Sequence, residues 1–259
     1  MVDYVLELRT VQTHVIKTLI EALKEILTDA SIEYTSDGLK LIAMDSTNTI
    51  LVHLKLHGDK FEKYVCKRNA VFGISMINFH KIIKTISNDD TLSIYIDDTN
   101  PNVLKIISEN AAKKSITTYE LNLIDLDSEQ HKFKDQTFDS VITMPSLDFQ
   151  KICKDMYNLS ETIEIKNVGS QLIFSCNGDF AKQETVFNQV DNTESRKSDS
   201  NQVVQGYYNL KYLVLFSKFT TLCQSVKILM RNNFPLTTVF NVGSLGELKM
   251  VLAPKIDNN

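Results

Sequence analysis

The chain of 259 residues is 43% hydrophobic and 23% charged, which is typical of a globular protein large enough to bury a core. Its net charge of −4 would repel DNA on average, so a nucleic-acid role would depend on where its positive charges gather. The start of the chain lacks the pattern of a signal peptide, and no stretch has the roughly 18 consecutive apolar residues of a membrane span. We therefore expect a soluble, intracellular protein without membrane contact.

Four segments carry apolar residues at the spacing of one buried helix face, and each is predicted to be an amphipathic helix. These segments are Thr13 to Leu27, Ser75 to Ser87, Pro145 to Asn158 and Asn209 to Leu222. Pro145 is compatible with a first helical turn, and Asn209 is a suitable N-cap residue.

Short runs rich in β-branched and aromatic residues lie between the predicted helices. Ser36-Asp37-Gly38 separates two of these runs and predicts a β-hairpin. Residues 97–101, 167–170 and 231–235 separate further pairs of runs. One strand before each helix and about three strands after it give four βαβββ units, two in each half of the chain. The sequence therefore predicts an α+β fold.

The middle of the chain contains a stretch without clear periodicity, NLIDLDSEQHKFKDQ. A loop of this length in a compact protein is usually functional or a linker. We therefore expect an amino-terminal domain at residues 1–121, an interdomain connector at 122–136 and a carboxy-terminal domain at 137–259.

Each predicted helix carries a pair of lysines opposite its apolar stripe. The pairs are Lys17 and Lys24, Lys81 and Lys84, Lys151 and Lys154, and Lys211 and Lys218. Spacings of three and seven place both members of a pair on one helix face. For a single helix the simpler interpretation is a solvated surface, but four pairs on four helices favour a shared basic surface. Lysine attracts phosphates without reading bases, so such a surface would suit DNA of any sequence.

Sequence motifs of catalysis are absent: the chain has no phosphate-binding P-loop, no G-x-S-x-G and no H-E-x-x-H. The four cysteines lie far apart and the five histidines are scattered, which does not indicate a metal site. We therefore expect no enzymatic activity, no metal and no cofactor. The alternative from another class, a nuclease or ligase with one basic face, would need a carboxylate cluster that the sequence does not reveal.

Several longer segments are more specific, and they occur in this order: LRTVQTHVIKTLIEALKEI, KLIAMDSTNTILVHLKL, CKRNAVFGISM, YELNLIDLDSEQ, VITMPSLDFQKICKDM and LKMVLAPKI. They resemble the corresponding stretches of the proliferating cell nuclear antigen family of DNA sliding clamps, and the resemblance covers essentially the whole chain. It implies the DNA-clamp fold, with two similar domains per chain, and a head-to-tail homotrimeric ring with sheets outside and helices lining the channel. The eight lysines named above are then DNA-binding channel residues.

The resemblance also implies an apolar pocket that binds short motifs of partner proteins. Its positions in this chain are Met44, Asn48, Thr49, Leu51, Phe133, Phe234, Pro235, Val251, Leu252, Ala253 and Pro254. The connector departs from the family pattern, because His131 replaces an apolar residue while Lys132 and Lys134 replace small and proline residues. We therefore expect an altered preference for partners.

Edge-to-edge strand pairing between subunits is implied as well. The matching segments are Ser115 to Leu121 of one chain and Gly178 to Val186 of its neighbour. Closing a ring in this way would remove exposed sheet edges. Ile116, Tyr119 and Phe180 are the candidate contact residues.

The function implied by the resemblance is that of a DNA polymerase processivity factor. A homotrimer would encircle duplex DNA and tether DNA polymerase and other replication and repair proteins with short clamp-binding motifs. An ATP-driven clamp loader would open the ring. The expected location is the nucleus, or the viral replication compartment for a virus-encoded chain. The alternative is a subunit of a heterotrimeric checkpoint clamp in DNA-damage signalling, against which the intact MDST and LAPKI segments argue.

Overall fold

The computed structural model describes residues 4–126, 136–188 and 203–255. These residues form two compact units. Unit 1 contains residues 4–46, 52–126 and 241–248, and unit 2 contains residues 47–51, 136–188, 203–240 and 249–255.

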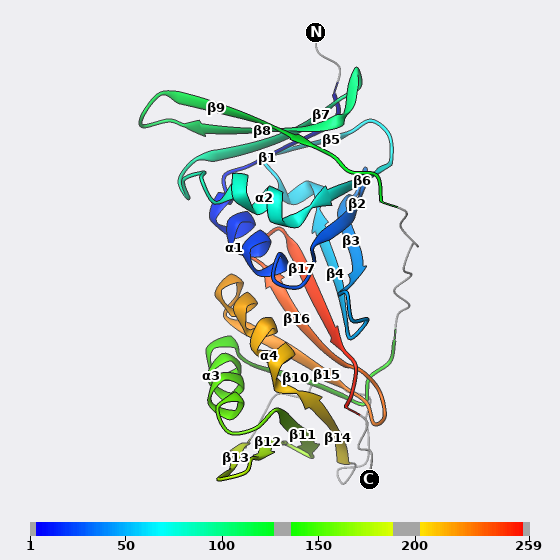
Figure 1. The fold of residues 1–259 in the computed structure, drawn as a ribbon, viewed down its shortest axis with the longest axis vertical. Coiled ribbons are helices and arrows are strands. Elements are labelled where there is room, and N and C mark those ends of the chain that lie inside the picture. The colour runs from blue at the N-terminus through cyan, green and yellow to red at the C-terminus, as the bar shows by residue number, and fades with distance from the viewer. Residues whose placement is uncertain (1–3, 127–135, 189–202, 256–259) are drawn as a thin grey trace. The chain divides into compact units, whose positions relative to one another are not determined.

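Unit 1 contains a five-stranded antiparallel sheet with the strand order β5-β1-β7-β8-β9 (Figure 1). Its strands are β1 (Tyr4–Thr10), β5 (Lys63–Cys66), β7 (Thr91–Asp97), β8 (Asn100–Asn110) and β9 (Ser115–Asn122). Four further strands are neighbours in the order β4-β3-β2-β6, namely β2 (Asp29–Thr35), β3 (Gly38–Met44), β4 (Ile50–His57) and β6 (Ala70–Ser75). Helices α1 (Thr13–Leu23) and α2 (Met76–Ile83) pack against each other, and a short 3₁₀ turn, η1 (Gly58–Lys60), follows β4.

Unit 2 contains a four-stranded antiparallel sheet with the order β13-β12-β11-β14 (Figure 1). Its strands are β11 (Thr162–Val168), β12 (Gln171–Asn177), β13 (Lys182–Phe187) and β14 (Val203–Asn209). Four further strands follow the order β10-β15-β16-β17, namely β10 (Ser140–Pro145), β15 (Ser225–Met230), β16 (Leu236–Val242) and β17 (Gly246–Leu252). Helices α3 (Ser146–Tyr157) and α4 (Leu210–Phe216) pack together, and the 3₁₀ helix η2 (Ser217–Leu222) follows α4.

The order of elements confirms the four predicted βαβββ units. The first unit is β1-α1-β2-β3-β4, and the others begin at β6, β10 and β14. The short strand β5, which pairs with β1, was not predicted. Along β11 and β12 buried residues alternate with partly exposed ones, because one face of the sheet covers the core while the other faces solvent.

The helices are shorter than their apolar periodicity predicts. The fourth α-helix ends at Phe216, and residues 217–222 continue as a 3₁₀ helix. The hydroxyls of Ser217 and Thr220 donate hydrogen bonds to the carbonyl oxygens of Val214, at 2.8 Å, and Ser217, at 2.6 Å. Such bonds compete with the backbone pattern of an α-helix. The predicted N-cap is confirmed, since the Asn209 side chain accepts from the amide of Lys211 at 2.9 Å.

None of the helices in the described residues is long and apolar enough to span a membrane.

Candidate functional site

The lysines of α1 are partly used inside unit 1. Lys17 is half-buried, and its ammonium donates a hydrogen bond to the carbonyl oxygen of Ile86, beyond the end of α2. Lys24 directly follows α1 and forms an ion pair of 2.9 Å with Glu25. Both lysines were predicted to project from an open helix face. Because Lys17 satisfies a carbonyl and Lys24 is partly neutralised, α1 offers less free positive charge than expected.

Both lysines of α2 are exposed. Lys81 donates a long hydrogen bond of 3.4 Å to the side-chain oxygen of Asn78, and Lys84 caps the end of the helix. Burial, together with the nearby Lys24 ammonium, holds the pKa of His80 below its ordinary value. His80 is therefore uncharged at neutral pH, and the positive charge of this face comes from lysine.

All four predicted lysines of unit 2 are exposed. On α3, Lys151 forms an ion pair with Asp155 one turn later, while Lys154 projects from the same stripe. The ammonium of Lys211 lies 5.5 Å from the ring centroid of Tyr212 on α4, and Lys218 lies on η2. Exposed ammonium groups of this kind can hold a polyanion without fixing its sequence.

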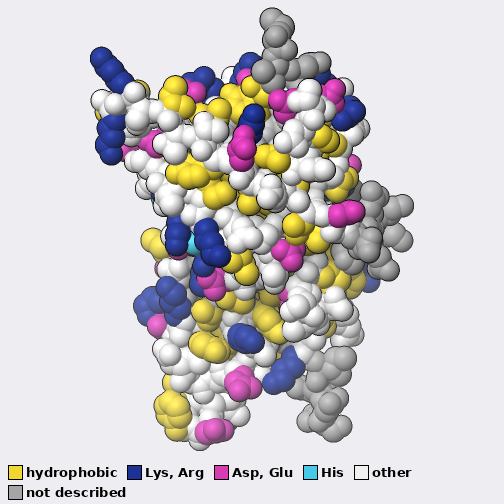
Figure 2. All heavy atoms as spheres, turned by 45° about the horizontal axis from the view of Figure 1, so that its top comes forward, with side chains coloured by type: hydrophobic (Ala, Val, Ile, Leu, Met, Phe, Trp, Pro, Cys, Tyr) yellow, Lys and Arg dark blue, Asp and Glu magenta, His cyan; other side chains and the backbone are white. Residues whose placement is uncertain are grey.

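The basic side chains do not form an unbroken patch on every face. Figure 2 shows lysine and arginine side chains interspersed with acidic and apolar ones on the face that it presents. Nearby acidic groups reduce the field of a lysine, and salt screens it over about 8–10 Å. Contact with DNA would therefore depend on a few exposed ammonium groups at close range.

Nine of the eleven predicted partner-binding residues lie in unit 2. Met44 belongs to unit 1, and Phe133 lies outside the described residues. The amide of Ala253 donates to the carbonyl oxygen of Thr49 at 3.0 Å, which joins the segment 47–51 to the end of β17. Leu252 is fully buried, so it supports this surface from the core instead of contacting a partner.

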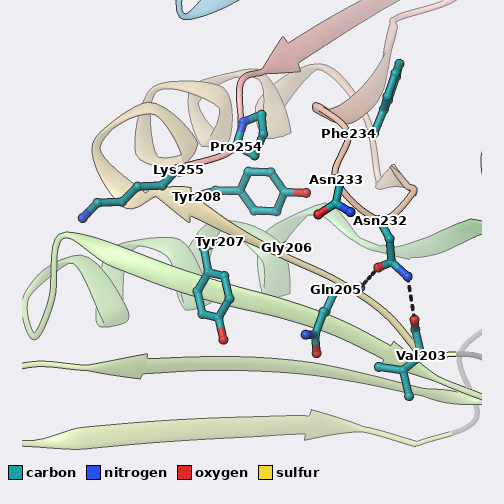
Figure 3. Close-up of a pocket in the computed structure, with 10 residues that line it drawn as sticks. All are labelled: Val203, Gln205, Gly206, Tyr207, Tyr208, Asn232, Asn233, Phe234, Pro254 and Lys255. Carbon is teal, nitrogen blue, oxygen red and sulfur yellow. Dashed lines mark hydrogen bonds between the residues drawn. The ribbon is translucent and has the colours of Figure 1, made fainter. Parts of the chain in front are cut away.

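Phe234 and Pro254 line a cavity of about 390 Å³, which we call the β14 niche (Figure 3). The niche is lined by Val203, Gln205, Gly206, Tyr207, Tyr208, Asn232, Asn233, Phe234, Pro254 and Lys255. The side chain of Asn232 accepts from the amide of Gln205 at 2.8 Å and donates to the carbonyl oxygen of Val203 at 2.9 Å. These two bonds fix the turn between β15 and β16 against strand β14.

The predicted subunit-contact residues lie at two sheet edges. Strand β9 is the last strand of its sheet in unit 1, and strand β13 is the last strand of its sheet in unit 2. Ile116 on β9 is 72% exposed, and Phe180, just before β13, is 78% exposed. The hydroxyl of Tyr119 is hydrogen-bonded to that of Thr85 at 2.9 Å, so Tyr119 is on the face of β9 that meets the end of α2.

Comparison with known proteins decides the family. A family profile described as the amino-terminal domain of proliferating cell nuclear antigen matches residues 5–131, and one described as its carboxy-terminal domain matches residues 132–255. The chain belongs to the proliferating cell nuclear antigen family. One curated relative is the "Probable DNA polymerase sliding clamp 1" of Paramecium bursaria Chlorella virus 1. The two chains are 32% identical over 251 residues, which cover 95% of each chain.

Membership in the proliferating cell nuclear antigen family agrees with the α+β fold of two clamp domains. Within the described residues, no group of three or more His, Cys, Asp or Glu side chains is arranged to hold a metal ion. Sequence reasoning missed the inner wall of the β14 niche, formed by Gly206 and Tyr208. A glycine inside a strand pattern could have signalled a close approach at this position.

Proposed function

We propose that the chain is a DNA sliding clamp that acts as a homotrimer and tethers DNA polymerase to duplex DNA. The observation that carries this proposal is the complementarity of two sheet edges, β9 and β13, within one chain. Each edge leaves a row of backbone groups available to another strand, and an exposed edge is a ready template for pairing. The edges differ from each other, so pairing between copies would be head-to-tail.

The side chains of the two edges favour one register. On β13, Gln183, Thr185 and Phe187 share the core face. Their partners on β12 are all buried, namely Cys176, Phe174 and Leu172. On β9, Thr117, Tyr119 and Leu121 share the face that meets α2. Pairing must match faces, which leaves registers that differ by steps of two residues.

If the two strands pair antiparallel, in one of these registers Ile116 faces Val186, Thr118 faces Glu184 and Glu120 faces Lys182. The first pair joins two exposed apolar side chains, which are 72% and 41% exposed in the single chain. The last pair joins opposite charges, and Glu120 also lies 3.7 Å from Lys105 on its own sheet. A shift of two residues in either direction would bring Glu120 against Glu184 or Phe180. Cross-strand pairs contribute roughly 0.2–1 kcal/mol each, so several matched pairs favour this register.

Three copies are proposed on the basis of the family, in which head-to-tail contacts close a ring around DNA. The exposed lysines of α2, α3, α4 and η2 would face the phosphates, where they would hold the duplex loosely and allow sliding. DNA-binding channel residues in this proposal are the eight helix lysines. Lys17 and Lys24 contribute less, because their charges are engaged within unit 1.

The clamp would act by tethering and not by chemistry. Topological linkage keeps a bound polymerase at high effective concentration near its template. Partners with short clamp-binding motifs would dock at the surface that includes Phe234, Pro235 and Pro254. An ATP-driven loader would open the ring, and the protein would act in the nucleus or in a viral replication compartment, the latter supported by similarity to a viral clamp.

Two measurements test this proposal. The solution mass of the purified protein should be that of three chains, and a single-chain mass at high concentration would exclude the homotrimer. Charge reversal of Lys81, Lys84, Lys151 and Lys154 should strongly reduce stimulation of a polymerase on primed DNA while leaving the mass unchanged. Unaffected stimulation would contradict the channel role of these lysines. Matched self-complementary edges argue against a heterotrimeric checkpoint clamp, whose edges would have to fit different subunits.

A further inference from the structure

The β14 niche contains a tyrosine hydroxyl that has no hydrogen-bond partner among the described residues. Tyr208 is only 1% exposed, yet its ring points its hydroxyl into the niche, toward Asn233 (Figure 3). The hydroxyl opens into the cavity, so a polar group of a ligand or a water there can complete its hydrogen bond. Burial raises the pKa of Tyr208 to about 12, so the hydroxyl remains a proton donor at neutral pH.

The space beside this hydroxyl exists because residue 206 is glycine. A β-carbon at Gly206 would stand 2.2 Å from the hydroxyl oxygen of Tyr208. Any larger residue at this position would fill the niche or displace the ring. Asn232 holds the opposite wall in place through its two hydrogen bonds to β14. The niche is therefore a preformed cavity with a fixed donor at its base.

The polar side chains that line the niche carry hydrogen-bond donors, which suit a negative group. Among the described lining residues, the charged one is Lys255, whose ammonium is held by the Thr162 hydroxyl at 2.6 Å. The guanidinium of Arg231 lies 4.8 Å from the ring centroid of Phe234, which lines the niche. The side-chain amides of Gln205 and Asn233 supply additional donors. None of the described lining residues is a carboxylate, and the Glu164 carboxylate beside the niche already accepts a hydrogen bond from the Tyr207 hydroxyl at 3.1 Å. An anion beside Tyr208 would therefore meet hydrogen-bond donors.

We propose that the β14 niche is a subsite for a carboxylate carried by a partner segment whose apolar anchor occupies the adjoining partner-binding surface. The inference rests on the proposed function, because Phe234 and Pro254 belong to both the surface and the niche. The Tyr208 hydroxyl donates to the carboxylate, and the niche thereby selects among partners that share the same apolar motif. The carboxylate comes from an aspartate or glutamate side chain or from the end of the partner chain.

The test uses fluorescein-labelled peptides that carry an aromatic clamp-binding motif and vary at one flanking position at a time. Glu, Gln, Ala and Lys are placed at each flanking position, and a further set ends there with either a free or an amidated carboxyl group. Binding to the full-length protein is measured by fluorescence anisotropy. At one position Glu should bind about tenfold more tightly than Ala, because a buried hydrogen bond to a charged group is stronger than one to a neutral group. Lys should bind more weakly than Ala at that position.

The variants Tyr208→Phe and Gly206→Ala should bring the ratio of Glu to Ala affinity close to one. Tyr157→Phe is the matched control, because Tyr157 is exposed on α3 of the same unit and does not line the niche. Melting temperature and solution mass show whether each variant folds. Tyr208→Phe tests the subsite by itself if Gly206→Ala does not fold.

The possible outcomes are distinguishable. A preference for Glu that survives in Tyr208→Phe would overturn the subsite while leaving the partner surface intact. Equal affinities for Glu, Gln and Ala at all flanking positions, together with equal affinities for free and amidated carboxyl ends, would do the same. Failure of every peptide to bind would overturn the proposed partner surface and the subsite together. Selective binding of peptides with a free carboxyl end would identify the chain terminus as the source of the carboxylate, whereas tight binding of amidated Glu peptides would identify the side chain.

Discussion

Gly73 lies so close to Ile124 that a β-carbon on Gly73 would stand 2.2 Å from the carbonyl oxygen of Ile124. The amide of Ile124 in turn donates to the carbonyl oxygen of Gly73 at 3.0 Å, which forms an isolated antiparallel bridge. This bridge attaches the chain that leaves β9 to the outer edge of β6. It therefore fixes the start of the predicted connector and covers a sheet edge.

The variant Gly73→Ala should break this bridge, because the new methyl group cannot coexist with the carbonyl of Ile124. We expect faster hydrogen exchange at the Ile124 amide and a loss of about 1–3 kcal/mol in the free energy of unfolding. Hydrogen exchange by mass spectrometry and urea denaturation measure both effects. Val71→Ala on the same strand is the control, since Val71 is 48% exposed. Unchanged exchange at Ile124 in Gly73→Ala would show that the bridge is not a stable contact.

Lys17 and Lys154 should behave differently when their charges are removed. Lys17→Met should lower the melting temperature, because the Ile86 carbonyl loses its donor, and should change DNA affinity little. Lys154→Met should leave the melting temperature within about a degree of that of the unaltered protein. It should weaken DNA binding and make the affinity depend less on salt than in the unaltered protein. Thermal unfolding and a salt titration of DNA binding distinguish the two. Equal salt dependence for both variants would contradict the different roles assigned to them.

The proposed subunit register predicts the result of a charge exchange. Glu120→Lys should weaken trimer formation, because the new lysine would lie against Lys182 of the neighbouring copy. Lys182→Glu should weaken it likewise, because the new glutamate would lie against Glu120. The double variant should recover most of the loss, since the attraction is restored with reversed polarity. Each single change is expected to weaken a contact by about 1 kcal/mol, or about fivefold. Sedimentation at decreasing concentration provides the measurement, with Lys166→Glu on β11, which is separated from β13 by strand β12, as a control. Additive losses in the double variant would exclude this register.

Asp90 should give the stability of unit 1 a specific pH dependence. A hydrogen bond from Ser108, joined by bonds from Asn110 and the amide of Ser87, holds the pKa of Asp90 below its ordinary value although burial acts the other way. The ionised group therefore stabilises the fold above its unfolded pKa of about 3.9, and this contribution is lost as the pH falls through the lower folded value.

Asp90→Asn should consequently lower the melting temperature at pH 7, by roughly 3 °C. The difference from the unaltered protein should shrink as the pH falls below about 4, because the unfolded chain takes up a proton there while native Asp90 stays ionised down to a lower pH. Melting curves between pH 3 and pH 7 would measure this difference in melting temperature. Asp89→Asn is the control, because Asp89 is the exposed neighbour of Asp90. A difference that stayed constant down to the lowest pH would mean that the charge of Asp90 contributes nothing.

Much of the fold could be predicted because its signals are local. The spacing of Val15, Leu19 and Leu23 predicts a helix, and Ser36-Asp37-Gly38 predicts the hairpin between β2 and β3. The exposed lysines of α2 and α3 also follow from periodicity, because a residue opposite an apolar stripe must face away from the core. The early ends of the α-helices were missed, since hydroxyl groups such as those of Ser217 and Thr220 compete with helical hydrogen bonds at short range.

The sequence by itself determined the four βαβββ units and the lysine pairs, and its resemblance to a known family pointed to the residues at the two sheet edges. Tertiary structure alone decided that the Lys17 ammonium bonds to the Ile86 carbonyl, that Gly73 touches Ile124 and that Gly206 leaves room beside the Tyr208 hydroxyl. Periodicity reports which way a side chain points from its own element. Which distant atom it meets depends on how separate elements pack, and no local pattern contains that information.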